Sequence, residues 1–330
     1  QAEEHLFSLA AKGGRRTGFR AFTEAVEASV NMAAEAYKND NGLAGLPTGL
    51  TDLDRMMGGL QKSDLIVLAG RPGMGKTSLA TNIAYNLASN GCNVGFASLE
   101  MSEEQLATRI LSEQSEIPSS ELRRGMIHEG QFTKFADTAT AIRNLPLFVD
   151  DAGGQSISML VSSARRLHRL HPLDLLVVDY LQLLSGTGRK GYEGRVQEIT
   201  EITTSLKALA KELNCPVLAL SQLSRQVENR EDKRPHLADL RDSGSIEQDA
   251  DVVLFVYREE YYLKQKEPEE NTAEHLVWQQ KMTEVSGVAE VIIGKQRHGP
   301  AGTVPLHFNA KLTKFGNLER RAFDLGRAVA

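Results

Sequence analysis

Short apolar runs alternate along the chain with longer segments of helical periodicity. Runs of about four to eight apolar residues bounded by Gly, Asp or Ser are typical of buried strands. Apolar residues at every third or fourth position are typical of helices that pack one face on a sheet. Strands are predicted at 65–69, 93–99, 146–150, 174–179, 216–221 and 251–257, and helices at 77–89, 102–114, 157–170 and 196–213. This alternation predicts an α/β fold with a mainly parallel sheet covered by helices on both faces.

The C-terminal part has a different pattern. Two further strands, 288–293 and 303–308, flank residues 295–300, which we predict to form a hairpin loop at the edge of the sheet. Two segments without a clear period are predicted to be loops: 185–194, which is Gly-rich and basic at its centre, and 264–287, which is charged and polar. We interpret the latter as a mobile surface insertion.

The N-terminal part is predicted to be helical. Residues 1–11 have the apolar spacing of the end of an amphipathic helix, 13–18 have the composition of a hinge, and 20–38 have helical spacing again. We therefore divide the chain into a helix with its hinge at 1–18 and an α/β domain at 19–330. Because the first residue is Gln1 and not Met, we interpret the chain as part of a longer one.

Composition excludes several classes of protein. The 38 Lys and Arg against 43 Asp and Glu give a net charge of −5, so the chain as a whole does not attract nucleic acid, and any contact must come from a local patch or several chains. Cys92 and Cys215 are the two cysteines and form neither a disulfide framework nor a metal-binding spacing. No apolar stretch reaches the length of a membrane span, and no signal peptide is recognised. We predict a cytoplasmic protein that does not enter a membrane.

The sequence GRPGMGKT at 70–77 fits the phosphate-binding loop Gly-x-x-x-x-Gly-Lys-Thr, with a predicted strand before it and a helix after it. Glycines let backbone N–H groups turn toward phosphate oxygens, and the helix adds its positive N-terminal end. Lys76 can reach the β- and γ-phosphates of ATP, and the Thr77 hydroxyl can ligate Mg²⁺. The alternative is a Gly-rich turn with a chance lysine, which the flanking elements disfavour. The predicted nucleotide-binding residues here are Gly70, Gly73, Gly75, Lys76, Thr77 and Ser78.

Two acidic residues follow predicted strands at the same edge of the sheet. Asp179 ends the apolar run 175–178, where it would hold Mg²⁺, usually through water. Glu100 follows strand 93–99 and is the candidate that orients the attacking water. The alternative role for Glu100 is to cap the helix that begins near Ser102.

Three further groups carry candidate chemistry. Gln222 ends strand 216–221 and can sense the γ-phosphate, or can cap a helix at 223–228. The loop 240–245 suits contact with a sugar-phosphate backbone, or is an ordinary loop with a solvated arginine. Lys295 and Arg297 can face a neighbouring molecule's γ-phosphate as fingers supplied in trans, or form an exposed basic hairpin.

Together these motifs resemble the RecA-type motor of the bacterial replicative DNA helicases, the DnaB family. The segments that carry the resemblance are TGLTDLD at 48–54, GGL at 58–60, DLIVLAGRP at 64–72, SLEMS at 98–102, DYLQ at 179–182, LSQLSR at 220–225, LRDSGSIEQDAD at 240–251 and KQRHGP at 295–300. They occur in the family's order. The chain departs from the family in the longer segment 264–287 and in Asp242, where the family often has Glu.

The resemblance implies a RecA-like core in a hexameric ring that hydrolyses ATP with Mg²⁺ at subunit interfaces and moves 5′-to-3′ on single-stranded DNA. It assigns phosphate and Mg²⁺ to Lys76, Thr77 and Asp179, the water to Glu100, γ-phosphate sensing to Gln222, the trans fingers to Lys295 and Arg297, and the DNA contact to Arg241, Asp242 and Gly244. It makes residues 1–11 the end of a linker helix that packs on a neighbour, and implies a primase and a helicase loader as partners. The alternatives are a recombinase or recombination mediator that forms filaments, and a small-molecule phosphotransferase.

Overall fold

The computed structural model describes residues 21–38, 42–186 and 192–318. The chain divides into two compact units, Gln1–Ala44 and Gly45–Ala330, which are taken separately below. In the first unit the described element is helix α2 (Phe22–Lys38), which confirms the helix predicted at 20–38. The predicted helix at 1–11, the hinge and the boundary after residue 18 lie outside the described residues.

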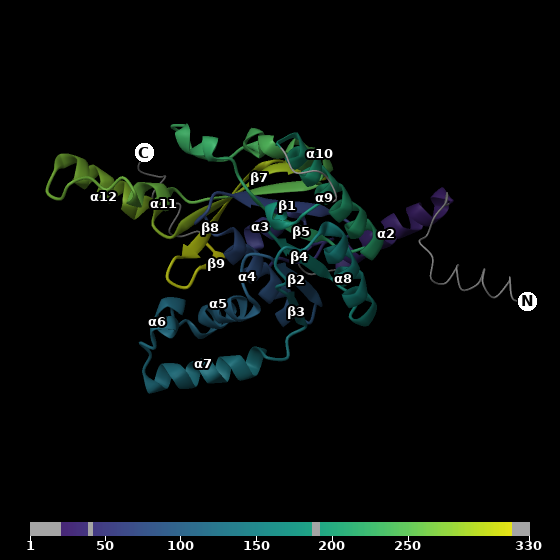
Figure 1. The fold of residues 1–330 in the computed structure, drawn as a ribbon, viewed down its shortest axis with the longest axis horizontal. Helices are drawn as coiled ribbons and strands as arrows, with labels where there is room; N and C mark the ends of the chain where they lie inside the picture. The colour runs from purple at the N-terminus through teal and green to yellow at the C-terminus, as the bar shows by residue number, and fades with distance from the viewer. Residues whose placement is uncertain (1–20, 39–41, 187–191, 319–330) are drawn as a thin grey trace, which may run out of the picture. The chain divides into compact units, whose positions relative to one another are not determined.

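The second unit is built on a sheet of nine strands in the order β3-β2-β4-β5-β1-β6-β7-β8-β9 (Figure 1). The first six strands in this order, which are β3, β2, β4, β5, β1 and β6, pair in parallel. The last three, β7, β8 and β9, continue the sheet in antiparallel pairing. The strands are β1 (Leu65–Gly70), β2 (Val94–Ser98), β3 (Leu147–Asp150), β4 (Leu175–Asp179), β5 (Val217–Gln222), β6 (Val252–Tyr257), β7 (Val288–Gln296), β8 (Gly302–Asn309) and β9 (Lys314–Asn317). The predicted mainly parallel sheet is therefore confirmed, with β9 as an addition that the sequence pattern did not indicate.

Helices cover both faces of this sheet, as predicted. The helices are α3 (Thr51–Met57), α4 (Lys76–Ser89), α5 (Glu103–Ser115), α6 (Ser119–Arg124), α7 (Glu129–Ile142), α8 (Ile157–Leu170), α9 (Tyr192–Leu213), α10 (Gly244–Asp249), α11 (Glu259–Lys264) and α12 (Ala273–Val285), with short 3₁₀ helices η1 (Leu181–Leu183), η2 (Arg225–Asn229) and η3 (Leu237–Ser243). Among these, α3, α4 and α5 pack on one face and α8 and α9 on the other (Figure 1). None of the described helices is long and apolar enough to span a bilayer.

Strand β1 connects the two hydrophobic cores. Ile66 and Leu68 belong to the core under α4, whereas Leu65, Val67 and Ala69 belong to the core under α9. All five are fully buried, because a parallel strand at the centre of a sheet has no solvent-facing side. The apolar run that predicted this strand therefore reports burial on both faces, and it ends where the polar loop 71–75 begins.

The segment 264–287, predicted to be a loop, is largely helical. Its main element, α12, follows α11 and extends away from the sheet (Figure 1). Apolar periodicity missed this helix because none of its residues is buried. Local contacts stabilise it instead: the Thr272 side chain caps its first turn, and the Trp278 Nε1 donates to the Leu263 carbonyl at 2.8 Å. The helices α6 and α7, which were not predicted, have no buried residue either.

Burial on β1 predicts a large cost for truncation. Leu68 is fully buried and Leu276 on α12 is 67% exposed, so the same substitution can be compared at both positions. Leu68→Ala is expected to lower the free energy of unfolding by about 2–5 kcal/mol through lost burial and a residual cavity. Leu276→Ala is expected to change it by less than about 0.5 kcal/mol. Denaturant titration measures both, and equal effects would contradict the described core.

Candidate nucleotide-binding and hydrolysis site

The loop at 70–77 links β1 to α4 and is shaped by its glycines. Gly73 and Gly75 have φ of +79° and +100°, values that side-chain-bearing residues rarely adopt. A Cβ at Gly73 would also lie 2.9 Å from the ring of Tyr261, which packs against the loop. Gly75 is the N-cap of α4, so backbone N–H groups of the first turn are free of helical partners there. The loop has the backbone of an anion-binding turn.

A cleft of about 320 Å³ opens beside this loop. It lies where parallel strands reach their carboxyl ends, the usual place for a ligand in an α/β sheet. Of the predicted site residues, it is lined by Gly73, Gly75, Lys76, Thr77, Ser78, Glu100, Asp179 and Gln222. Gly70 is the last residue of β1, and Lys295 and Arg297 do not line the cleft.

Asp179 and Thr77 meet in the cleft. The Thr77 hydroxyl donates to Asp179 Oδ2 at 2.8 Å, and Asp179 is 1% exposed. Register brings Asp179 beside Ser98 at the end of β2, and the Leu99 N–H donates to its carbonyl at 2.8 Å. Lys76 Nζ donates to the Arg71 carbonyl at 3.4 Å. Two oxygen groups suited to a hard cation and one ammonium suited to phosphate therefore share one wall.

Glu100 lies at the cleft and does not cap the next helix. The N-cap of α5 is Ser102, whose side chain accepts a hydrogen bond from the Gln105 N–H in a capping box. The capping interpretation of Glu100 is therefore wrong. Glu100 is an exposed side chain on the cleft wall, where a carboxylate can accept a proton from water.

Gln222 is placed beside the phosphate loop by strand register. It pairs directly with Gly70 in the parallel ladder of β5 and β1. Gln182 holds its backbone from η1, since the Gln222 N–H donates to Gln182 Oε1 at 3.3 Å. The following η2 has Ser224 as its N-cap, so the interpretation of Gln222 as a helix cap is wrong. Its exposed side chain is left to the cleft.

Two arginines in the cleft were missed by sequence reasoning. Arg109 reaches it from the second turn of α5, and Arg258 reaches it from the residue after β6. Arg258 is 7% exposed, stacks 3.9 Å from the centre of the Phe308 ring and donates to the Gly73 carbonyl at 3.3 Å. Its Nε has no hydrogen-bond partner among the described residues. A signal for Arg258 existed, because it follows the strand next to β1 at the same edge, whereas spacing alone does not indicate Arg109.

Burial shifts the pKa values of the ionisable groups in this cleft. It lowers the pKa of the Lys76 ammonium, an effect that Asp179 and Glu100 oppose. It likewise lowers the pKa of Arg109, which acidic groups including Asp179 oppose, and raises the pKa of Asp179, which the Thr77 hydrogen bond opposes. An anion bound between Lys76 and Arg109 would offset the desolvation of both cations. The electrostatics therefore fit a polyphosphate.

The predicted fingers lie at the amino ends of the parallel strands, opposite the carboxyl ends where the cleft opens. Lys295 is near the end of β7, where its Nζ donates to the carbonyls of Glu247 at 2.5 Å and Ala250 at 2.8 Å. The Arg297 Nε lies 3.0 Å from Asp251 Oδ1. Asp251 precedes β6, which runs parallel to β1, so it marks the amino edge of the strands. Neither cation is near the cleft of its own chain.

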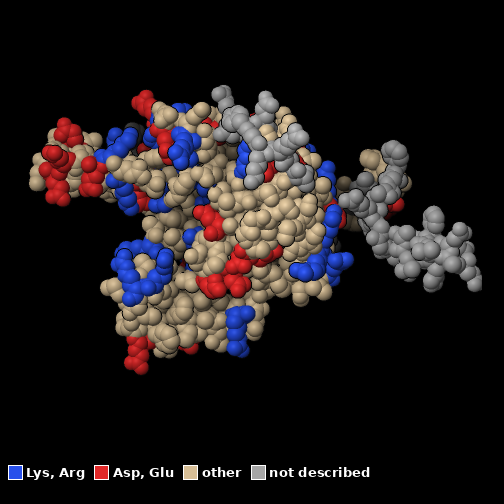
Figure 2. Space-filling view, in the orientation of Figure 1, with Lys and Arg blue, Asp and Glu red and all other residues tan. Residues whose placement is uncertain are grey.

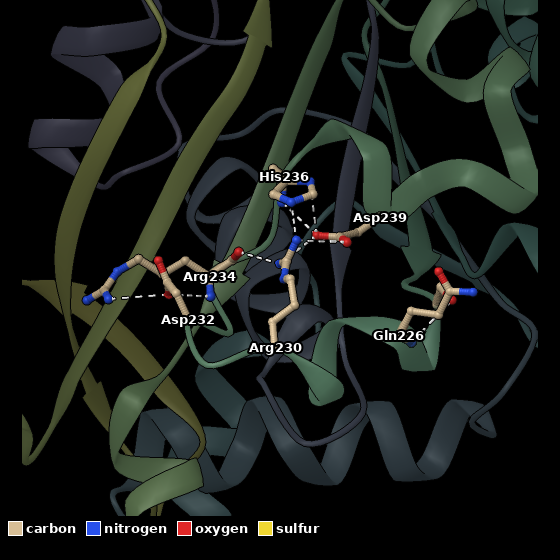
Figure 3. A network of polar contacts seen from close by, with 7 residues as sticks. Gln226, Arg230, Asp232, Arg234, His236 and Asp239 are labelled. Carbon is tan, nitrogen blue, oxygen red and sulfur yellow. Dashed lines mark hydrogen bonds and ion pairs between the residues drawn. The ribbon is translucent and has the colours of Figure 1, made fainter.

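Polar contacts brace the segment that leads away from Gln222. The Arg230 Nη2 lies 3.0 Å from Asp239 Oδ2, and it also donates to the Arg234 carbonyl at 2.8 Å (Figure 3). The His236 N–H donates to the same carboxylate at 2.9 Å. Asp239 is 8% exposed, so this ion pair fixes the residues between η2 and η3. These contacts hold the segment together through its own side chains.

The predicted DNA contact lies directly after this segment. Arg241 and Asp242 lie in η3, and Gly244 begins α10. Their side chains lie outside the described part of the structure. On the face drawn in Figure 2, Lys and Arg form separate patches interspersed with acidic ones.

The fold and the cleft define a RecA-like P-loop ATPase: a phosphate loop after β1, acidic residues after β2 and at the end of β4, and a polar residue at the end of β5. A family model described as the DnaB-like helicase C terminal domain matches residues 45–317. The chain therefore belongs to the DnaB-like helicases. It has the ATPase core of a replicative DNA helicase.

Individual relatives agree with this assignment. The chain is 48% identical to the replicative DNA helicase DnaB of Rickettsia conorii, over 98% of this chain and 67% of that protein. It is 41% identical to the replicative DNA helicase DnaC of Bacillus subtilis, over 98% of this chain and 69% of that one. Among solved structures, an isolated ATPase domain has a TM-score of 0.78 at 36% identity and covers 92% of this chain and 100% of its own. A DnaB-like replicative helicase studied with primase has a TM-score of 0.76 at 35% identity, over 96% of this chain and 71% of its own.

The position of Glu100 generates a first test of this site. Glu100→Gln keeps the shape of the side chain but removes the base, so ATP hydrolysis is expected to fall by about 10²–10⁴-fold. Nucleotide binding should persist because Lys76 and the loop are unchanged. Glu103→Gln, at the start of α5 and outside the cleft, is the matched control. Hydrolysis near the wild-type rate in Glu100→Gln, measured by phosphate release, would remove Glu100 from this role.

A second test concerns Glu113, which is fully buried behind Arg109 on α5. Burial raises its pKa from 4.5 to about 8, although Arg109, Lys314 and a hydrogen bond from Asn82 oppose the shift. The folded state therefore favours the protonated acid, and stability is lost as pH rises from about 4.5 to about 8. Glu113→Gln resembles the protonated form. It is expected to be more stable than wild type by about 1–3 kcal/mol above pH 8 and equal to it near pH 4. A difference in unfolding free energy that does not change with pH would contradict this account.

Proposed function

We propose that the chain is the motor of a hexameric replicative helicase that couples ATP hydrolysis to 5′-to-3′ movement on single-stranded DNA. One observation carries the proposal: the cleft and the predicted fingers Lys295 and Arg297 lie at opposite edges of one sheet. A head-to-tail contact between two copies brings opposite faces together, and repetition of such a contact closes a ring when the rotation is right. Each interface then holds one complete site.

The substrate in this proposal is ATP with Mg²⁺. Thr77 Oγ1 and Asp179 Oδ2, which lie 2.8 Å apart, are the oxygen groups that would hold the metal, directly or through water. The described residues contain no cluster of three or more His, Cys, Asp or Glu side chains that could hold a metal alone, which fits an ion that also binds phosphate oxygens. When bound, Mg²⁺ neutralises charge on the phosphates.

The chain's own residues divide the remaining work. Lys76 and the N–H groups of the loop bind the β- and γ-phosphates, and Glu100 orients the attacking water. Arg109 and Arg258 add positive charge from within the subunit. Arg297 supplies charge from the neighbour in the transition state. Lys295 must leave the two carbonyls that it binds at the end of α10 if it is to join Arg297 there.

The γ-phosphate is linked to DNA through the braced segment after Gln222. Gln222 touches the cleft, and residues 223–240 lead to Arg241, Asp242 and Gly244, which are proposed to bind the sugar-phosphate backbone. Contacts to phosphate predict little sequence preference and strong salt dependence. Six such loops around one channel remove the need for a basic chain, in line with the net charge of −5.

The proposed setting is the replication fork in the cytoplasm, with primase and a helicase loader as partners. The solved relative that was studied with primase supports primase as a partner. In the first unit, α2 exposes Phe22, Val26, Val30 and Tyr37, which fits a helix that packs on another protein surface. The linker helix proposed at 1–11 would precede it. The filament-forming recombinase is not favoured, because the matching proteins are replicative helicases over nearly the whole chain.

Mixed rings test the shared site. Arg297→Ala is expected to retain ATP binding but to lose about 10³-fold or more in hydrolysis, because the finger acts only in the transition state. Lys76→Ala is expected to lose turnover as well. Mixing the two variants creates interfaces with a wild-type loop from one subunit and a wild-type finger from the other, so steady-state hydrolysis should return in part.

The control mixture pairs Lys76→Ala with Glu100→Gln. Both changes lie in the same cleft, so no interface in that mixture has a complete site and hydrolysis should stay low. Recovery in the control, or no recovery with Arg297→Ala, would contradict catalysis shared between subunits.

A further inference from the structure

The Arg297 side chain is held by a buried carboxylate at one point only. Asp251 is 2% exposed, and its Oδ1 lies 3.0 Å from Arg297 Nε in an ion pair. The Asp251 carbonyl also accepts from the Arg297 N–H at 3.1 Å. No hydrogen bond to the two terminal nitrogens of Arg297 is formed by the described residues, and the side chain is 50% exposed. The ion pair is formed at the inner nitrogen of the guanidinium, on the side away from the two terminal nitrogens.

Asp251 is itself fixed from two other elements. Its Oδ2 accepts from the Leu65 N–H at 2.8 Å, at the start of β1, and from the ammonium of Lys207 on α9. Lys207 also donates to the Ser63 carbonyl at 2.8 Å. Lys207 also lies 3.9 Å from Asp64 Oδ1, so one ammonium faces two carboxylates and Arg297 adds the second positive charge. Asp251 cannot move without disturbing β1 and α9.

A β-bulge in β7 brings Arg297 to this carboxylate. The register of β6 and β7 shifts at Gly294, so Val253 pairs with Lys295 but Leu254 pairs with Ile293. Before the shift, Ile293 faces the core under α4; after it, Lys295 contacts α10 on the other side of the sheet. A Cβ at Gly294 would lie 2.5 Å from the Phe255 ring, so only glycine fits this bulge without movement. Bulges commonly re-aim side chains in this way.

We propose that Asp251 is the positioning residue of the Arg297 finger, holding the guanidinium by its Nε so that both terminal nitrogens face the phosphate bound by the neighbouring subunit. The inference rests on the proposed function, since it presupposes a finger supplied in trans. An arginine loses substantial rotamer entropy when it is ordered, and a side chain already held in place loses less on meeting its target. The same carboxylate binds the start of β1. The finger that serves the neighbouring subunit's site is therefore anchored to the strand that carries the phosphate loop of its own subunit.

Asp251→Asn is the direct test. The amide keeps an oxygen for the Leu65 N–H but loses the charge that orients Arg297. Hydrolysis by the assembled, full chain is expected to fall by about 10²-fold, the effect of a displacement near 1 Å. Binding of a non-hydrolysable ATP analogue should be unchanged, because the cleft lies at the other edge. Asp249→Asn is the matched control, since Asp249 binds Thr203 and Thr204 but not Arg297.

A double variant separates positioning from a general structural effect. Asp251→Asn combined with Arg297→Ala should be no slower than Arg297→Ala alone if Asp251 acts through the finger. If Asp251→Asn fails to fold, Asp251→Glu keeps the charge while moving it by one methylene, and the same loss and the same non-additivity are expected.

The outcomes distinguish the inference from the proposed function. Wild-type hydrolysis in Asp251→Asn or Asp251→Glu, together with slow Arg297→Ala, would overturn the positioning role and leave the trans finger in place. A double variant slower than Arg297→Ala would overturn it too. Wild-type hydrolysis in Arg297→Ala would instead remove the finger itself.

Discussion

The register of β1 with its parallel neighbours is the constraint on which the site depends. It pairs Gly70 with Gln222 on one side and sets Ile66 against Val252 on the other. Hydrogen bonds of this kind cannot slip by one residue without exchanging the two buried faces of the strand. The phosphate loop, the Gln222 side chain and the residue after β6 are therefore held at one edge by the same ladders. At the opposite, amino ends of the strands, the Leu65 N–H of β1 donates to the carboxylate of Asp251.

This arrangement explains why a single subunit has two functional edges. The carboxyl edge holds Lys76, Thr77, Asp179 and Glu100 around one cleft, and the amino edge holds Arg297. In the proposed ring these edges meet between neighbours. The sheet then acts as a rigid body between two sites, because its central strands β1, β4 and β6 are buried on both faces. The interface, and not the isolated fold, is the proposed functional unit.

Much of the fold follows from apolar patterns because buried strands and the helices that cover them bury most of their apolar surface. The run 65–69 and its helix 77–89 were predicted almost to the residue. The pattern failed at α12, where no residue is buried and a cap and Trp278 supply the stability. It also failed at β9, a short strand at the edge of the sheet. Such elements depend on local or long-range contacts that periodicity does not record.

The site was predictable where chemistry follows strand ends, as for Asp179 and Glu100. It was not predictable for a residue inside a helix, such as Arg109 in the second turn of α5, because its position in the sequence does not show that it reaches the cleft. Sequence spacing also could not show that Lys295 donates to a carbonyl of α10 or that Arg297 forms an ion pair with Asp251. Both contacts depend on the register shift at Gly294, which changes the direction of the side chains that follow it.

The most direct measurement is a structure of the assembled protein with single-stranded DNA and a transition-state analogue of ATP hydrolysis. The terminal nitrogens of Arg297 are expected to lie within hydrogen-bond distance of the analogue bound at the neighbouring subunit's Lys76, with the Nε still paired with Asp251. An interface in which Arg297 stays remote from every nucleotide would contradict it.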